Sequence, residues 1–210
     1  MSKYHDDRTA ASDPVLISIS DAKLRPLQPE LYGWRSRWRK LPYFGQLIKA
    51  AILREVIGEH MQFGDSRAAL VIHSAPLVVA AYTDEQDAVV LLQFPAKLAS
   101  DYRLEKGAKL LTVNTYFRGD RLAHDIVLGS ESTGRYANCY PIIAEIVSDD
   151  EDVIARRKRS IATSEWQRTE RLARAALAKQ QIYVRDGRPL FSHLPGRIID
   201  RASRSGERAQ

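Results

Sequence analysis

The stretch Arg67–Phe94 reads RAALVIHSAPLVVAAYTDEQDAVVLLQF and decides the fold. It holds three apolar runs rich in Val, Ala and Leu, separated by Ser-Ala-Pro and by Thr-Asp-Glu-Gln-Asp. β-prone runs bounded by short polar breaks are typical of successive antiparallel strands. Because the runs are almost continuously apolar and do not alternate, we predict strands inside a sheet that is covered on both faces.

Three acidic residues, Asp84, Glu85 and Asp87, lie in the second of these breaks. Carboxylates can act as general acid and base, or bind a divalent cation, where they converge in a concave place. Between two strands, however, acidic residues favour a turn. We therefore predict that all three carboxylates are exposed at a hairpin tip and do no chemistry.

Two helices are expected to pack on this sheet. Residues 46–61 place apolar side chains at steps of three and four, which indicates an amphipathic helix, and Gly64 is placed to end it. Residues 149–180 are expected to form one long helix, because Ser148 and Glu151 match a capping box. The expected fold is therefore α+β, a mainly antiparallel sheet of at least five strands packed with these two main helices.

Segments on either side of this centre carry weaker signals. Residues 15–20 alternate apolar and polar side chains and predict a short strand, whereas Pro26 and Pro29 argue against regular structure after it. Residues 109–119 and 122–129 predict a second hairpin.

The C-terminal third holds two further apolar segments. Residues 136–147 fit either a strand or a helix, since Pro141 suits an edge strand or a first helical turn. Residues 182–191 predict a small hairpin around Asp186-Gly187.

A chain of 210 residues with 44% hydrophobic and 28% charged residues fits a single globular domain. We expect a loose N-terminus over residues 1–14, one α+β domain over 15–195 and a basic, flexible tail over 196–210. The single cysteine excludes a disulfide within the chain, and no apolar run approaches the roughly 18 residues of a membrane span. We therefore expect a cytoplasmic protein without a membrane span.

The net charge of +6 is unevenly distributed, because residues 151–210 hold 14 Lys and Arg against 7 Asp and Glu. Such asymmetry suits an acidic partner, nucleic acid in particular, and equally suits a solvated helix face with a tail. Two basic clusters are candidates for binding such a partner. They comprise Trp34, Arg35, Arg37, Trp38, Arg39 and Lys40 in the first, and Arg156, Arg157, Lys158 and Arg159 in the second.

Both clusters allow a functional and a structural interpretation. If the first cluster binds nucleic acid, its tryptophans would stack on bases and its arginines would contact phosphates. The same tryptophans would also suit a core position that the stems of the arginines cover. The second cluster would otherwise be a solvated helix face.

The loop over residues 129–140, GSESTGRYANCY, has the composition of a ligand site. Its candidate residues for binding an anion are Ser130, Ser132, Thr133, Arg135 and Cys139. The loop lacks the Gly-Lys-Ser/Thr of a phosphate-binding loop, and no base is identified near Cys139, so we predict that Cys139 is not a nucleophile. The alternative is an ordinary surface loop.

No catalytic residue, metal ligand or cofactor is assigned, because the five histidines and one cysteine show no metal-binding spacing. Three functions remain open. The preferred one is a non-catalytic interaction or regulatory module that binds a protein partner, with homo-oligomers allowed. The alternatives are a nucleic-acid-binding protein that uses clusters 34–40 and 156–159, and a small enzyme with its site at loop 129–140.

Overall fold

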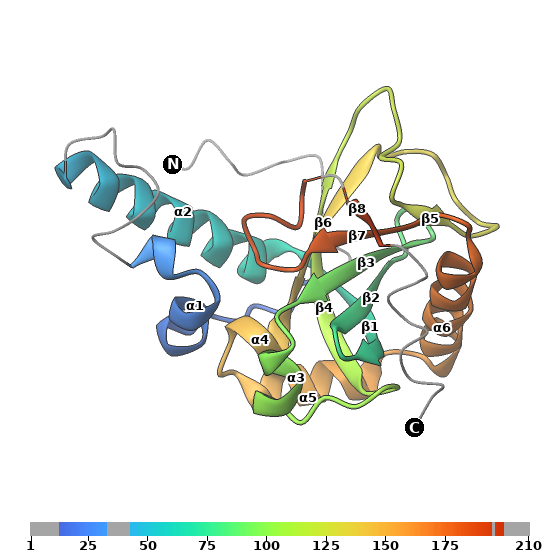
Figure 1. Cartoon of the computed structure of the whole chain (residues 1–210), viewed down its shortest axis with the longest axis horizontal. Coiled ribbons are helices and arrows are strands. Elements are labelled where there is room, and N and C mark those ends of the chain that lie inside the picture. The colour runs from blue at the N-terminus through green and yellow to red at the C-terminus, as the bar shows by residue number, and fades with distance from the viewer. Residues whose placement is uncertain (1–12, 33–42, 195, 200–210) are drawn as a thin grey trace.

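A computed structural model describes residues 13–32, 43–194 and 196–199 (Figure 1). Within these ranges the strands are β1 (Asp65–Ser74), β2 (Leu77–Thr83), β3 (Ala88–Phe94), β4 (Lys109–Phe117), β5 (Val127–Leu128), β6 (Asn138–Ile143), β7 (Ile182–Asp186) and β8 (Arg197–Ile199). They form one sheet in the order β6-β4-β1-β2-β3-β7-β8, with β5 paired to β3 off this path. The pair of β3 and β7 is parallel and the other pairs are antiparallel, so the sheet is mixed.

Helices account for most of the remaining described residues. They are α1 (Asp21–Leu27), the short 3-10 helix η1 (Pro29–Leu31), α2 (Tyr43–Phe63), α3 (Lys97–Asp101), α4 (Ala144–Val147), α5 (Glu151–Ser160) and α6 (Thr163–Ala178). A mostly antiparallel sheet with packed helices confirms the predicted α+β class.

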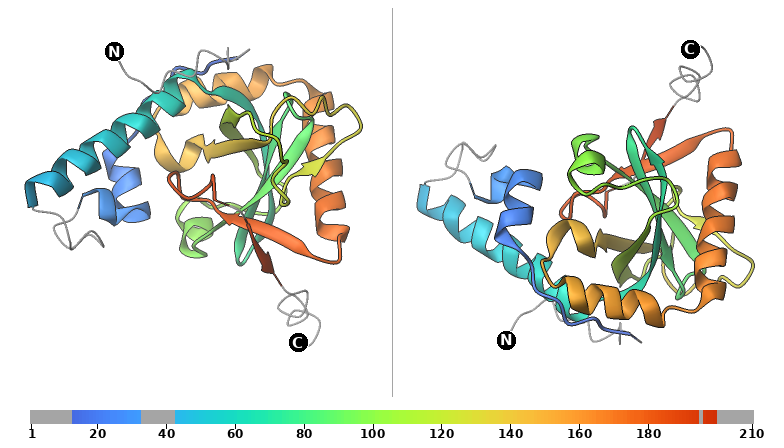
Figure 2. Two further views of the ribbon diagram at one scale, coloured as in Figure 1. Left: turned by 90° about the horizontal axis from the view of Figure 1, so that it is seen from above. Right: turned by 90° about the horizontal axis from the view of Figure 1, so that it is seen from below.

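The three strands of the opening stretch form the expected meander and are buried on both faces. In β2, Val78, Ala80 and Tyr82 join one apolar cluster, while the intervening Leu77 and Val79 join the other. Consecutive side chains of a strand point to opposite faces, so a continuous apolar run supplies two cores at once. α6 covers the first cluster, and α1, α2 and α4 lie on the other side of the sheet (Figure 2).

α2 projects from the body of the molecule at its N-terminal end and reaches the sheet at its C-terminal end (Figure 1). Ile57 and Met61, at 2% and 0% exposed, fix these last turns in the core. Gly64 ends the helix as predicted, with its N–H donating to the carbonyl of His60. A Cβ at Gly64 would lie 2.6 Å from the Val113 side chain, so only glycine allows this close approach of α2 to β4.

The predicted single helix over 149–180 is wrong, because the segment forms two helices, α5 and α6, separated by Ile161 and Ala162. Ile161 is extended, with φ of −66° and ψ of 126°, and only 7% exposed. The Ser160 hydroxyl donates to the carbonyl of Arg157 and so competes with the helical pattern. The break buries both Ile161 and Trp166, which a single straight helix would place on different sectors.

The predicted hairpin between 109–119 and 122–129 is also wrong. β4 already has β1 and β6 as neighbours, and β5 pairs with β3 instead. Periodicity alone could not show that both edges of β4 are occupied.

Two predictions near the N-terminus are corrected. Residues 15–20 do alternate, since Val15 and Ile17 are buried and Leu16 is exposed, but no strand pairs with them and they form no strand. Pro26 lies within α1, which forms because Ser20 caps it and Leu24 is buried in the core, and Pro29 begins η1.

The C-terminal hairpin closes later than predicted. β7 pairs with β8, so the connection runs over residues 187–196 and is not a tight turn at Asp186-Gly187. Residues 136–147 are both a strand and a helix, since β6 is followed directly by α4. β8 extends the sheet past position 195, while the N-terminal residues 1–12 and the tail residues 200–210 lie outside the described residues.

Candidate functional site

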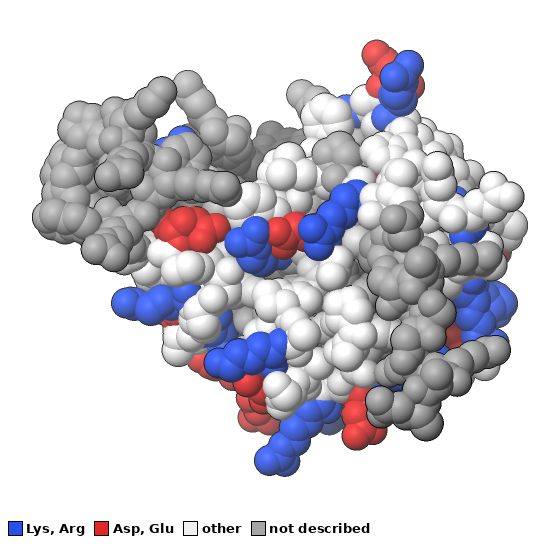
Figure 3. Space-filling view, in the orientation of Figure 1, with Lys and Arg blue, Asp and Glu red and all other residues white. Residues whose placement is uncertain are grey.

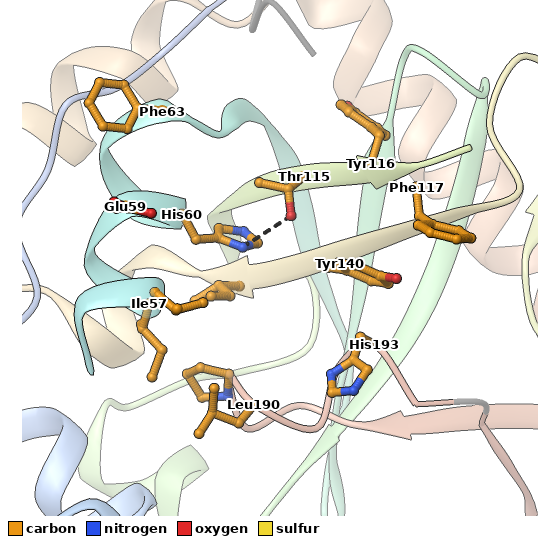
Figure 4. A pocket seen from close by; sticks show the side chains of 13 residues that line it. Ile57, Glu59, His60, Phe63, Thr115, Tyr116, Phe117, Tyr140, Leu190 and His193 are labelled. Carbon is orange, nitrogen blue, oxygen red and sulfur yellow. Dashed lines mark hydrogen bonds between the residues drawn. The ribbon is translucent and has the colours of Figure 1, made fainter. Parts of the chain in front are cut away.

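A hollow of about 430 Å³ lies where the last turns of α2 meet β4, β6 and the segment 189–193 (Figure 4). We call it the α2 pocket. It is lined by Val56, Ile57, Glu59, His60, Phe63, Thr115, Tyr116, Phe117, Tyr140, Ile142, Pro189, Leu190 and His193. A concave, mainly apolar hollow with a few polar groups is the usual form of a binding site.

His60 attaches the α2 wall of the pocket to β4. Its Nε2 lies 2.8 Å from the carbonyl oxygen of Val113, which can only accept, so Nε2 carries the proton. Nδ1 therefore accepts from the Thr115 hydroxyl at 3.2 Å, the contact drawn in Figure 4. Burial lowers the pKa of His60 to about 4, so the ring is neutral at pH 7.

The opposite wall is held by Arg185, whose side chain is 0% exposed. Its guanidinium forms two hydrogen bonds with the carboxylate of Asp125, from Nε at 2.8 Å and Nη2 at 2.7 Å. The other N–H groups donate to the carbonyls of Cys139 and Ser192 and to the side chain of Asn138. All five donors are satisfied, which ties β7 to β6 and fixes the segment 189–193 in place.

Polar rings face the pocket from this second wall. Tyr140 of β6 and His193 pack edge to face, with ring centroids 5.6 Å apart. Burial raises the pKa of Tyr140, whereas burial and the nearby Arg185 charge lower the pKa of His193. Both rings are therefore neutral at pH 7.

Two large apolar side chains in the lining of the pocket are exposed to solvent. Phe63, at the end of α2, is 51% exposed, and Phe117, at the end of β4, is 54% exposed. Their exposed rings offer apolar contact surface to a ligand that binds in the hollow.

The outer edge of β6 runs beside the pocket and is blocked. The Cys139 carbonyl accepts from Arg185, and the Cys139 N–H donates to the Asn138 side chain. Pro141 has no N–H to offer. An added strand would therefore find few free backbone groups here.

The structure does not bring the predicted residues of loop 129–140 together. Cys139 is buried in β6, where burial raises its pKa to about 11, whereas Ser130, Thr133 and Arg135 are exposed. Ser132 is half-buried.

Internal contacts also occupy part of this loop. Thr133 donates to the carbonyl of Glu85, and Arg135 lies 3.9 Å from the Glu85 carboxylate.

The four cations at positions 156–159 divide into two pairs on α5. Arg156 and Arg159 are exposed. Arg157 donates to the hydroxyl and the carbonyl of Ser66, and Lys158 pairs with the Glu145 carboxylate at 2.8 Å. Half of the predicted cluster therefore serves intramolecular contacts.

Basic and acidic side chains are interspersed on the face that Figure 3 shows. The other predicted basic cluster, Trp34 to Lys40, lies outside the described residues.

The three turn acids are not alike. Residues 84–87 do connect β2 to β3. Asp84 is exposed as predicted, but the prediction is wrong for Glu85, which is half-buried, and for Asp87, which is only 3% exposed. The Arg168 guanidinium forms two hydrogen bonds with the Asp87 carboxylate. Burial opposes ionisation of Asp87, but these bonds outweigh it and lower the pKa.

Sequence reasoning missed the α2 pocket. Its lining comes from four segments that lie far apart along the chain. The one local signal was the pair Phe63-Gly64, an apolar residue directly at a helix end.

Within the described ranges, no three His, Cys, Asp or Glu side chains are grouped so as to hold a metal ion, and no helix is both long and apolar enough to cross a bilayer. The chain matches no family model, and neither a curated protein nor a solved structure is significantly similar to it. The α2 pocket is therefore a candidate site on the geometry of its lining alone.

Proposed function

We propose that this chain is a non-catalytic binding module that receives an apolar side chain of a protein partner in the α2 pocket. The observation that carries the proposal is a mainly apolar hollow whose lining includes the exposed side chains of Phe63 and Phe117. Exposed apolar surface next to a hollow is typical of interaction sites. The partner's apolar side chain would replace water in this hollow.

An enzymatic role has one observation in its favour. Thr115 donates to His60, which resembles a nucleophile beside its general base. A general base needs a pKa near the working pH, and burial lowers the pKa of His60 to about 4. The contact therefore supports a structural role, which attaches α2 to β4.

A nucleic-acid role is less well supported than a protein partner. Among the described residues that line the α2 pocket there is no Lys or Arg, and Glu59 adds a carboxylate. Phosphate binding requires cations, and Arg157 and Lys158 are engaged within the chain. We propose the cytoplasm as the compartment, because the single cysteine is a free, buried thiol.

A peptide selection tests the proposal. Random twelve-residue peptides displayed on phage would be selected on the wild type, on Leu190→Trp and on Leu128→Trp. Leu190 lines the pocket, so Trp fills it, whereas Leu128 is 41% exposed on β5 and serves as the control.

The wild type and the control should enrich peptides that share one apolar anchor residue, and Leu190→Trp should not. Equal enrichment on all three proteins, or no common anchor, would contradict the proposal. A melting curve of each variant shows that it is folded before the selection.

A further inference from the structure

A second, more open hollow adjoins the α2 pocket along α2. It is lined by Ile19, Asp21, Ala51, Arg54, Glu55, Gly58, Glu59, Gln62 and Phe63. Glu59 and Phe63 line both hollows, so the two meet at these side chains. We call this second hollow the groove.

Carboxylates dominate the charge of this groove. Asp21 and Glu55 are exposed, and Glu59 lies one turn after Glu55 on the same side of α2. Among the lining residues that the structure describes, Arg54 is the one cation, and it lies 3.9 Å from Asp21 with its guanidinium over the Tyr32 ring. Three carboxylates against one cation make this described lining acidic, although the whole chain carries a net charge of +6.

We propose that the partner segment is basic, with an apolar anchor in the α2 pocket and Lys or Arg next to the anchor, facing Glu55 and Glu59. This inference rests on the proposed function of the pocket. Charge complementarity at a rim contributes to partner choice and association rate more than to affinity. The acidic groove thus selects among the apolar segments that would fit the hollow.

Open space in the groove suits such a segment. Apart from the backbone of its own helix and its chain neighbours, a Cβ built on Gly58 would meet no described atom within 4 Å, so nothing described packs against this position. Exposed Ile52, on the same stretch of α2, adds apolar surface for the stems of long cationic side chains.

The test uses synthetic twelve-residue peptides with Trp, Phe, Leu or Ala at the centre and three Lys, Gln or Glu on each side. Their affinities would be measured by fluorescence anisotropy at 50 mM and 500 mM NaCl. The proteins are the wild type, the double variant Glu55→Lys/Glu59→Lys and the matched control Glu105→Lys/Asp152→Lys. Glu105 and Asp152 are exposed and line neither hollow.

On the wild type, Lys-flanked peptides with an apolar centre should bind about tenfold tighter than Glu-flanked ones at 50 mM NaCl, and this preference should shrink at 500 mM. The Glu55→Lys/Glu59→Lys protein should reverse the preference, and the control should keep it.

Anchor-dependent binding without a preference for Lys flanks would overturn this inference and leave the proposed function intact. Binding that ignores the central residue, or no binding, would overturn both. The segment Trp34–Lys40 of a second copy has the same chemistry. Self-association at micromolar concentration that Glu55→Lys/Glu59→Lys abolishes would therefore replace a separate partner with a second copy.

Discussion

Two buried arginines hold this fold together, and they differ in how their charge is balanced. Arg185 is 0% exposed and faces one carboxylate, Asp125, with neutral oxygens as its other acceptors. Arg67 is 5% exposed and pairs with three carboxylates, Asp13, Asp65 and Asp84.

The difference decides which cluster responds to pH. Burial opposes ionisation of Asp125, but the hydrogen bonds from Arg185 outweigh it and lower the pKa. Burial and the neighbouring Asp84 raise the pKa of Asp65 to about 7, even though Arg67 opposes them. We call Arg185 with Asp125 the Arg185 cluster, and Arg67 with Asp13, Asp65 and Asp84 the Arg67 cluster. The Arg185 cluster keeps its charges across the neutral range, whereas the Arg67 cluster takes up a proton as pH falls through about 7.

The largest effect on stability is expected from replacing Arg185, which neutralises the buried Asp125 carboxylate. Arg185→Met leaves the buried Asp125 carboxylate without its cation, which costs about 3–5 kcal/mol of unfolding free energy. Chemical denaturation at pH 7 measures the loss. Replacing both partners, in Arg185→Met/Asp125→Leu, should recover much of it. A loss below about 1 kcal/mol for the single variant would contradict the role of Arg185.

A smaller effect is expected within the basic run of α5. Arg157 contacts Ser66 and lies 3.1 Å from Asp13, so it belongs to the Arg67 cluster. Arg157→Gln should cost about 1–3 kcal/mol, because it leaves polar groups without their partner. Arg156→Gln, at an exposed position, should stay within about 0.5 kcal/mol. Equal melting temperatures for Arg157→Gln and Arg156→Gln would contradict a stabilising role of Arg157 in this cluster.

The titration of Asp65 sharpens the comparison. Its pKa is about 7 in the folded chain, above the usual 3.8, so its contribution to stability is full below pH 4 and is lost as pH rises to about 7. Asp65→Asn removes this loss. Its stability relative to the wild type should therefore increase with pH between about 4 and 7, by at most about 1.4 kcal/mol per pH unit.

Asp125→Asn is the control for this titration, since Asp125 stays ionised and the difference from the wild type should be constant between pH 5 and 8. Comparing each variant with the wild type at the same pH cancels the opposite trend from His60, whose lowered pKa makes stability rise with pH. A difference for Asp65→Asn that does not change with pH would contradict the raised pKa.

The smallest effect is expected at Gly58 of α2, and Gly64, directly after the helix, serves as the comparison with the opposite sign. Gly58→Ala places its methyl in open space and should stabilise the chain by about 0.4–1 kcal/mol. Gly64→Ala should destabilise it, because the methyl would meet His60 and Val113. Thermal melting of the pair checks whether α2 packs on β4 as closely as described.

Local patterns predicted the centre of the fold but not its connections. The apolar runs of 67–94 define three strands and two covered faces, since each strand fills both cores with neighbouring residues. The break at Ile161 and the pairing of β5 with β3 depend on long-range packing. Such contacts leave no periodic trace in the sequence.

The candidate site was predictable only in its parts. That Cys139 is not a nucleophile stays a prediction, which rests on the lack of a partner base; the thiol is buried, and burial raises its pKa to about 11. Asp87 looked like any turn acid, because its partner Arg168 lies 81 residues further along the chain. The α2 pocket joins residues from Val56 to His193 and could not be read from any one segment.

A methyl NMR titration with a peptide selected on the wild type tests the central claim most directly. Val56, Ile57, Ile142 and Leu190 line the α2 pocket, and Val78, Leu91 and Val184 lie in the apolar cluster under α6. If the pocket receives the peptide's anchor, the first group shifts in a saturable way and the second stays unchanged. Shifts confined to the second group, or spread evenly over both, would contradict the account.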